Sequence, residues 1–390
     1  MTVVDMRNFF TDCQVHLIEI SESKIYYAEQ KEEEGHESLF LLEYDRETKT
    51  ERIVANYILS NPSYRRHYFG FEREIVMVME KGDEQAWVLR VDKQTGEEKN
   101  MAQIHFIGDL ADCKALDAEH ILFFTVPNNE HAHLFEEYQS LTGFPQIVYL
   151  YDLKTERYYY LKDPRFCYAT GSQILLYQHE DEPWLLLMMP FGTEQEKEMF
   201  YENRASLDYE VSDHVWTCPL KGFLEDVGQG REVCMTLLFQ SGTDGLLRYA
   251  GMDEQNLYFR ARHFPSEDQR ICMVNRNTLQ KDVAVMLNLL EEDEPANFLI
   301  DTTGGQVYRI TQHGDQCNIE GVLNSRVKGA YAADLGDFIA CVEDRFLIAR
   351  YVLSDDSDSF EFNFIFDLLT QEKQSFESRC AVSRDTVVLY

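Results

Sequence analysis

Short hydrophobic runs recur along the chain, and each ends in the same polar corner. Asp-x-x-Thr follows such a run and precedes another at Asp45–Thr48, Asp92–Thr95 and Asp152–Thr155. Asn275–Thr278 repeats the unit with Asn in first place, and Asp367–Thr370 returns to Asp. An Asp or Asn side chain at a strand end can accept hydrogen bonds from backbone N–H groups two residues on, which reverses the chain. The unit therefore predicts a hairpin corner, and its aspartates are expected to be structural rather than catalytic.

These corners define a repeat. Weaker equivalents around Pro219 and Asn324 bring the number of corners to seven, separated by 43 to 67 residues. A strand-like run lies upstream of most corners, as in "KIYYAEQ" from Lys24, "HILFFTV" from His120 and "NLYFRAR" from Asn256. A shorter run precedes most of these, so four strands fit in each step. Self-similarity at this period is typical of repeat architectures, and four-stranded meanders form the blades of a β-propeller.

The chain resembles the β-propeller class over nearly its whole length. The resemblance implies an all-β fold, WD40-like in having four-stranded blades, with seven blades favoured and eight left open. No subfamily motif accompanies it: no Trp-Asp strand ending occurs, and Gly304-Gly305 is the only Gly-Gly pair. A sandwich would not repeat so regularly, and a parallel solenoid would have a shorter period. The aromatic content of 13% also favours sheet.

Both ends of the chain have strand character. The tail, "RCAVSRDTVVLY" from Arg379, reads like the first two strands of a further blade. The start, "TVVDMRN" from Thr2, offers one more strand. Pairing the two ends in one blade would close the ring and protect its edge strands. We therefore predict a single propeller domain over residues 1–390.

Two insertions interrupt the repeat, at residues 128–144 and 191–213. Each joins the second strand of a blade to the third, and each is predicted to form a short helix. Leu134, Tyr138 and Leu141 share one helical face of the first insertion, and Thr193–Glu196 forms a capping box in the second. Connections between the second and third strands of a blade emerge on one face of a propeller, so the insertions of neighbouring blades should lie side by side. The predicted interaction residues are Leu134, Tyr138, Leu141, Glu196, Met199, Phe200 and Tyr201.

The net charge of the chain limits the classes of partner that we expect. The chain has 36 basic and 69 acidic residues, for a net charge of −33. A field of this sign repels phosphate backbones and anionic lipids, so we expect no nucleic acid and no membrane surface. Loops on the insertion face are acidic, which favours a basic protein partner, although such charge also serves plain solubility. We expect a monomer.

Cysteine usage and the N-terminus indicate a cytoplasmic protein. The nine cysteines are odd in number and widely spaced, and no CxxC occurs. The start of the chain lacks the basic and apolar regions of a secretory signal. The longest apolar run, "WLLLMMP" from Trp184, is far shorter than the ~20 residues that span a bilayer.

Two clusters have residue types that ligate metals. His131 and His133 stand among glutamates, but residues two apart on a helix do not face each other. Asp355, Asp356 and Asp358 lack the Gly and the distal Glu of an EF-hand loop. We therefore expect neither a metal nor another cofactor.

The sequence supports two function classes. The favoured hypothesis is a non-catalytic protein-interaction or scaffold propeller with an acidic docking face. The alternative is a small-molecule hydrolase or lyase, similar to a lactonase, with an axial pocket that a metal could assist. No nucleophile elbow or phosphate loop is present, and a sugar-binding propeller rests only on the abundance of tyrosine. His120, His214 and Arg260 could join an axial site, but their places in or beside strands make a structural role more natural.

Overall fold

The structure is a computed structural model that describes the chain except residues 10–12, 34–35, 60–64, 83, 137–145, 162, 168, 190–213, 240–245, 263–268, 288–295, 302–305, 314–315, 323–325, 333–336 and 355–358. The described chain is mostly β-strand. It divides into two compact units: residues 12–239, and residues 1–11 together with 240–390. We call these the 12–239 unit and the terminal unit.

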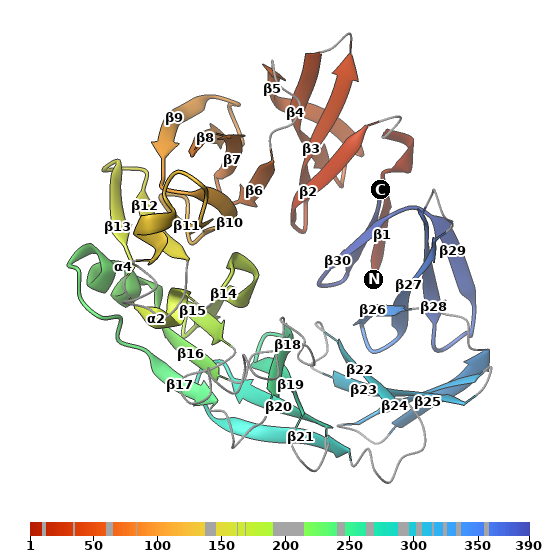
Figure 1. Cartoon of the computed structure of the whole chain (residues 1–390). Coiled ribbons are helices and arrows are strands. Elements are labelled where there is room, and N and C mark those ends of the chain that lie inside the picture. The colour runs from red at the N-terminus through yellow and green to blue at the C-terminus, as the bar shows by residue number, and fades with distance from the viewer. Residues whose placement is uncertain are drawn as a thin grey trace. The chain divides into compact units, whose positions relative to one another are not determined.

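The 12–239 unit contains four antiparallel sheets of four strands each, and each sheet is a meander of consecutive strands (Figure 1). Their strands are β2 (Gln14–Ile20), β3 (Lys24–Glu33), β4 (His36–Asp45) and β5 (Thr50–Leu59); β6 (Arg66–Gly70), β7 (Glu74–Gly82), β8 (Gln85–Asp92) and β9 (Glu98–His105); β10 (Asp109–Ala115), β11 (His120–Val126), β12 (Ile147–Asp152) and β13 (Arg157–Tyr160); and β14 (Ile174–His179), β15 (Glu182–Met189), β16 (His214–Pro219) and β17 (Thr236–Phe239).

The terminal unit continues the same pattern. One sheet contains β18 (Leu246–Met252), β19 (Asn256–Arg262), β20 (Gln269–Asn275) and β21 (Lys281–Leu287). Two further meanders are β22 (Ala296–Asp301), β23 (Gln306–His313), β24 (Gln316–Gly321) and β25 (Arg326–Ala332), and β26 (Asp337–Val342), β27 (Phe346–Ser354), β28 (Ser359–Asp367) and β29 (Lys373–Glu377).

The fold class is a β-propeller, as the repeat predicts. The described strands form six large sheets where we predicted seven blades. The difference arises because a parallel pairing of Asp301 with Cys341 joins β22 to β26, so that two four-stranded meanders count as one eight-stranded sheet. Every other large sheet formed by the described strands is a single four-stranded meander, as predicted.

The Asp-x-x-Thr corners form as predicted, between the third and fourth strands. In each, the Oδ1 atom of the Asp or Asn accepts hydrogen bonds from the backbone N–H groups two and three residues on, at 2.8–3.4 Å. The residue after the Thr lies in the left-handed region in all five corners, with φ between 55° and 71°. These residues are Lys49, Gly96, Glu156, Leu279 and Gln371.

Only one of these five left-handed positions holds glycine, and its neighbourhood explains why. A Cβ atom at Gly96 would lie 2.1 Å from the carbonyl oxygen of Val54, on the fourth strand of the preceding sheet. The other four positions carry side chains in the same backbone conformation. Gly96 therefore serves packing between two sheets of the 12–239 unit as well as turn geometry.

Bulges form a second repeat that the hydrophobic pattern did not reveal. An extra residue interrupts the first strand of four meanders, in β2, β10, β18 and β26. Another interrupts the fourth strand of five, in β5, β9, β17, β21 and β25. A bulge increases local twist, which suits blades that must pack face to face.

The two chain ends share one sheet, as predicted. β1 (Thr2–Asp5) pairs with β31 (Thr386–Leu389), and β31 pairs with β30 (Cys380–Ser383). β31 is antiparallel to β30, but β1 is parallel to β31. The side chains of Val387, Val388 and Leu389 are fully buried.

Helices occur where the repeat departs from its pattern. The corner expected around Pro219 is instead the start of α4 (Leu220–Gly228), which buries Leu220, Phe223 and Val227. This prediction was wrong because the apolar residues after Pro219 follow a helical period that we did not recognise. Two 3₁₀ turns, η1 (Arg7–Phe9) and η2 (Gly171–Gln173), and a short helix, α2 (Pro164–Cys167), also occur. The corner expected around Asn324 lies outside the described residues.

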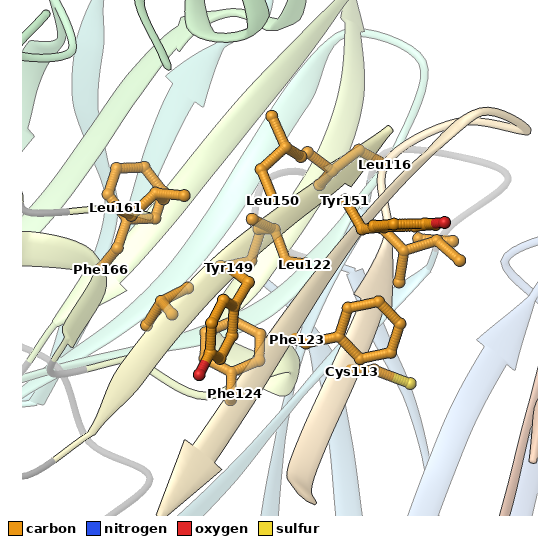
Figure 2. Packing of buried hydrophobic residues seen from close by; sticks show 14 of the residues in the cluster. Cys113, Leu116, Leu122, Phe123, Phe124, Tyr149, Leu150, Tyr151, Leu161 and Phe166 are labelled. Atoms are coloured by element: carbon orange, nitrogen blue, oxygen red, sulfur yellow. The ribbon is translucent and has the colours of Figure 1, made fainter. Parts of the chain in front are cut away.

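The largest core cluster fills the space within and between the last three sheets of the 12–239 unit. Figure 2 shows its aromatic centre, where Phe123 and Phe124 of β11 lie beside Tyr149 and Tyr151 of β12. Cys113 is buried in the same cluster, and no disulfide links the cysteines in the described part of the chain. None of the described helices is long and apolar enough to cross a membrane.

Candidate functional site: the root of the first insertion

Both insertions leave the framework where we predicted, between the second and third strands of consecutive sheets. The first runs from the end of β11 to the start of β12, and the second from β15 to β16. Both sheets belong to the 12–239 unit (Figure 1). Residues 132–136 of the first insertion are helical, as predicted. The rest of that insertion beyond 136, and all of the second, lie outside the described residues.

Glu84 organises the start of the first insertion. It stands in the turn between β7 and β8, and its Oε1 atom accepts three hydrogen bonds. The donors are the backbone N–H of Gly108 at 2.7 Å, the side-chain amide of Asn128 at 2.7 Å and Nδ1 of His131 at 2.6 Å. One carboxylate thereby joins three segments that are distant in sequence: a hairpin turn, the connection into β10 and the insertion root.

The electrostatics agree with this geometry. Burial acts to raise the pKa of Glu84, but the hydrogen bonds from Gly108, Asn128 and His131 outweigh it and hold the pKa below its ordinary value. The carboxylate is therefore ionised at neutral pH and acts as a permanent acceptor. Glu84 also has a φ of 59°, a conformation that a non-glycine residue adopts only with some strain.

Phe135 adds an apolar contact to the same root. Its side chain is buried, and its ring lies so close to Gly108 that a Cβ atom there would meet the ring at 2.4 Å. Gly108 itself has a φ of 85°. Phe135 thus packs on the framework, and Leu134, a predicted interaction residue, is half-buried.

The structure brings together few of the other predicted site residues. His133 is exposed, and His131 is held by Glu84. Tyr138, Leu141, Glu196, Met199, Phe200, Tyr201, Asp355, Asp356 and Asp358 lie outside the described residues. Within the described ranges, no group of three or more His, Cys, Asp or Glu side chains is arranged to hold a metal ion.

The three residues named for an axial site have structural surroundings. His120 Nδ1 lies 2.9 Å from the carboxylate of Asp117, in the turn before β11. His214 is buried at the first position of β16. Arg260 donates to the carbonyl oxygen of Phe298 at 3.1 Å and lies over its ring.

Sequence reasoning missed Glu84 because nothing local marks it. Glu84 and His131 are separated by 47 positions, and each lies in a polar turn of ordinary composition. The hydrophobic residue at Phe135 was the one usable signal, since an isolated aromatic side chain in a polar insertion needs a place to pack.

No family model matches the sequence, and no curated protein sequence matches it either. Among solved structures, a chain from an analysis of two prolyl endopeptidases is similar at a TM-score of 0.52 and 12% identity. The match covers 94% of this chain and 50% of that one, so this chain spans half the length of the endopeptidase.

Two isolated propeller domains are also similar. The β-propeller domain of the Trilobed protease from Pyrococcus furiosus matches at a TM-score of 0.45 and 10% identity, covering 94% of this chain and 98% of that one. The Cps50 (Swd1) propeller domain from Myceliophteria thermophila matches at 0.39 and 10%, covering 91% and 93%. Likeness at this level of identity shows nothing about activity.

Proposed function

We propose that the protein is a non-catalytic interaction propeller that binds another protein through the insertions at 128–144 and 191–213. The observation that carries the proposal is the anchoring of the first insertion by Glu84. The carboxylate fixes both Asn128 and His131 at the point where the chain leaves the framework. Binding residues are commonly carried on loops that a rigid scaffold holds in place.

Anchoring supports binding for an energetic reason. A segment that is ordered before binding loses less conformational freedom in the complex, so more of its contact energy appears as affinity. The hydrogen bonds of Glu84 with Asn128 and His131, and the packing of the Phe135 ring beside Gly108, hold the start of the insertion on the framework.

Charge indicates the kind of partner. The net charge of −33 favours association with a basic protein and speeds its encounter. The exposed carboxylate of Glu130 precedes the helical segment of the first insertion, and that of Glu136 stands at its last described position. The proposed partner is therefore a protein with a basic surface, bound in a manner that weakens as salt rises.

Affinity capture followed by binding measurements with the purified partner tests the proposal. Wild-type protein and a variant in which residues 193–206 are replaced by a short Gly-Ser linker are compared at low and moderate salt. We expect the wild type to capture a partner in stoichiometric amount and the linker variant to lose it. A second variant, Glu84→Ala, should weaken binding because the insertion root is released.

Glu156→Gln is a matched control, since it removes an exposed carboxylate at a corner that joins a third and a fourth strand. It should leave binding unchanged. Circular dichroism must show native folding for every variant. If the linker variant and Glu84→Ala both bind the partner as tightly as the wild type, the insertions are not the docking surface.

A further inference from the structure

A second polar constellation lies in the 12–239 unit, between its first two sheets. Gln30 of β3, Glu37 of β4, and Arg66 and Tyr68 of β6 face one another at one end of an otherwise apolar interface. Below them, that interface is filled by Ala28, Leu39, Met77 and other apolar side chains. We call these four polar residues the Arg66 cluster.

Arg66 is the unusual member. Its side chain is 4% exposed and that of Glu37 is 6% exposed, so this is a buried ion pair. Nη1 of Arg66 lies 2.5 Å from Oε1 of Glu37. The remaining edge of the guanidinium, formed by Nε and Nη2, is buried and has no hydrogen-bond partner among the described residues.

The Glu37 carboxylate also lacks hydrogen-bond donors. Both of its oxygens are buried and accept no hydrogen bond within the described part of the chain, although Oε1 faces Nη1 of Arg66 in the ion pair. A buried donor or acceptor without a partner is destabilising, and more so when it is charged. Native interiors rarely leave such atoms unmatched, so this group of buried donors and acceptors is suited to binding a polar molecule.

The hydroxyl of the neighbouring Tyr68 can donate a hydrogen bond. The side-chain amide of Gln30 donates to the Tyr68 hydroxyl at 3.2 Å, which leaves the Tyr68 proton available. Burial raises the pKa of Tyr68 to about 12, so this proton stays in place at neutral pH. Arg66 also donates a hydrogen bond to this hydroxyl, and that bond and the Arg66 charge act to lower the pKa of Tyr68, whereas the charge of Glu37 acts to raise it.

The polar atoms of Arg66 and Glu37 that lack hydrogen-bond partners indicate which kind of ligand could bind them. The Nε–Nη2 edge presents two parallel N–H donors, a geometry that fits two oxygens of a carboxylate or phosphate. Oε2 of Glu37 needs a donor. A small oxyanion that also carries a hydroxyl meets both needs, because it accepts from Arg66 and donates to Glu37.

We propose that the Arg66 cluster binds a small hydroxyl-bearing oxyanion, of the class that contains hydrogen phosphate and 2-hydroxycarboxylates. Arg66 holds the anion by its free edge, Glu37 accepts from the hydroxyl, and Tyr68 donates to a further oxygen. This site is separate from the insertion root, and its occupancy is independent of the interaction function proposed above.

His16 of β2 is exposed, and its ring centroid lies 5.6 Å from that of Tyr68. Because the net charge of the protein is −33, long-range attraction does not draw an anion in, and binding must come from these short-range contacts.

Thermal melting of the full chain, with titration calorimetry, tests the proposal. Phosphate, lactate and acetate are added separately at constant ionic strength balanced with chloride. We expect a saturating rise in Tm with phosphate or lactate, and the one that saturates first identifies the source of the oxyanion. Acetate, which has two oxygens but no hydroxyl donor, should produce a smaller rise.

The variant Arg66→Lys keeps the charge beside Glu37 and removes the paired donors, so it should fold and lose affinity roughly tenfold or more. Arg52→Lys is the matched control, since Arg52 of the same unit is already bonded to Glu43 and to two backbone carbonyls. Equal responses of wild type and Arg66→Lys, or no saturable response to phosphate and lactate, would overturn the proposal. A high-resolution crystal structure grown in phosphate with only water at the Arg66 edge would do the same.

Discussion

At the scale of single residues, the corners show how local chemistry sets the framework. Asp152 illustrates the unit most fully: its carboxylate accepts from the backbone N–H groups of Lys154 and Thr155 and from the Thr155 hydroxyl. All three contacts lie within three positions along the chain. The corner is therefore encoded where it forms, and it needs no help from distant residues.

Replacing this acceptor should be costly. We expect Asp152→Ala to lower the free energy of unfolding by about 1–2 kcal/mol, because two backbone N–H groups lose their partner. Asp152→Asn retains an acceptor oxygen, as Asn275 does in its own corner, and should lose less. Urea denaturation of the two variants beside the wild type measures the difference; equal losses would mean that the carboxylate charge matters more than the hydrogen bonds.

The same residue predicts a pH effect. Burial acts to raise the pKa of Asp152, but hydrogen bonds from Thr155 and Lys154 hold it below its ordinary value of 3.8. A carboxyl with a depressed pKa contributes stability above its unfolded-state pKa and loses it as pH falls through the folded-state pKa. Stability should therefore fall below about pH 4, and the fall should be shallower in Asp152→Ala when unfolding is followed from pH 5 to 2.

Residues with positive φ in the corners allow a second test at the scale of single residues, namely whether backbone strain affects stability. Glu156 is exposed and has a φ of 55°. Glu156→Gly should stabilise the protein by about 0.5–1 kcal/mol, because glycine adopts this conformation without strain. Gly96→Ala should destabilise it by about 1–3 kcal/mol, since the new methyl would meet the Val54 carbonyl. If both variants melt at the wild-type temperature, turn strain is not important here.

At the scale of elements, α4 shows how a departure from the repeat is stabilised. The helix occupies the connection between β16 and β17 and buries Phe223 completely. The Phe223 ring lies 5.2 Å from that of Phe166 in α2, and Arg165 of the same short helix stacks over Trp216 at 4.9 Å. An extra helix is therefore held by aromatic contacts with the neighbouring connection.

Removing the Phe223 ring tests whether these aromatic contacts stabilise α4. We expect Phe223→Ala to lower the free energy of unfolding by about 3–5 kcal/mol, through lost apolar burial and the cavity left behind. Lys221→Ala, on the exposed side of the same helix, should change it by less than about 0.5 kcal/mol. Guanidinium denaturation of both variants gives the comparison, and a small effect of Phe223→Ala would show that α4 adds little to the fold.

At the scale of the whole molecule, the chain ends contribute to one sheet. The first strand pairs in parallel with the last, and Val4 is buried with Val387 and Leu389 in the terminal unit. Met1 contributes its side chain to the same apolar cluster. Residues nearly 390 positions apart therefore stabilise each other directly, which no local pattern could specify.

Deleting Thr2–Asp5 should expose this dependence. Backbone amides of Val387–Leu389 should exchange hydrogen markedly faster, because β31 loses one of its two partner strands. Amides of β11, in the other unit, serve as the internal control and should be unaffected. Hydrogen exchange followed by mass spectrometry measures both regions in one experiment, and unchanged protection in β31 would show that β1 is dispensable.

The repeat, the strand character, the corners and the positions of the two insertions could all be predicted from the sequence. Each of these depends on residues within a few positions, such as Asp152 with Thr155, or on a hydrophobic alternation that persists along a strand. Pairing of the chain ends could also be predicted, because two unmatched strands remained once the repeats were assigned. The helix after Pro219 was missed because the repeat pattern was extended over a segment with a different period.

Which polar residues meet depends on the assembled fold. Glu84 and His131 lie in connections that belong to different sheets, and Glu37 and Arg66 lie on strands of different sheets, so both pairs form only because neighbouring sheets pack together. The parallel direction of β1 against β31 and the joining of β22 to β26 are likewise results of packing. Contacts between sheets depend on register and twist summed over many residues, so a side chain that looks ordinary in the sequence becomes part of a site only when the blades are assembled.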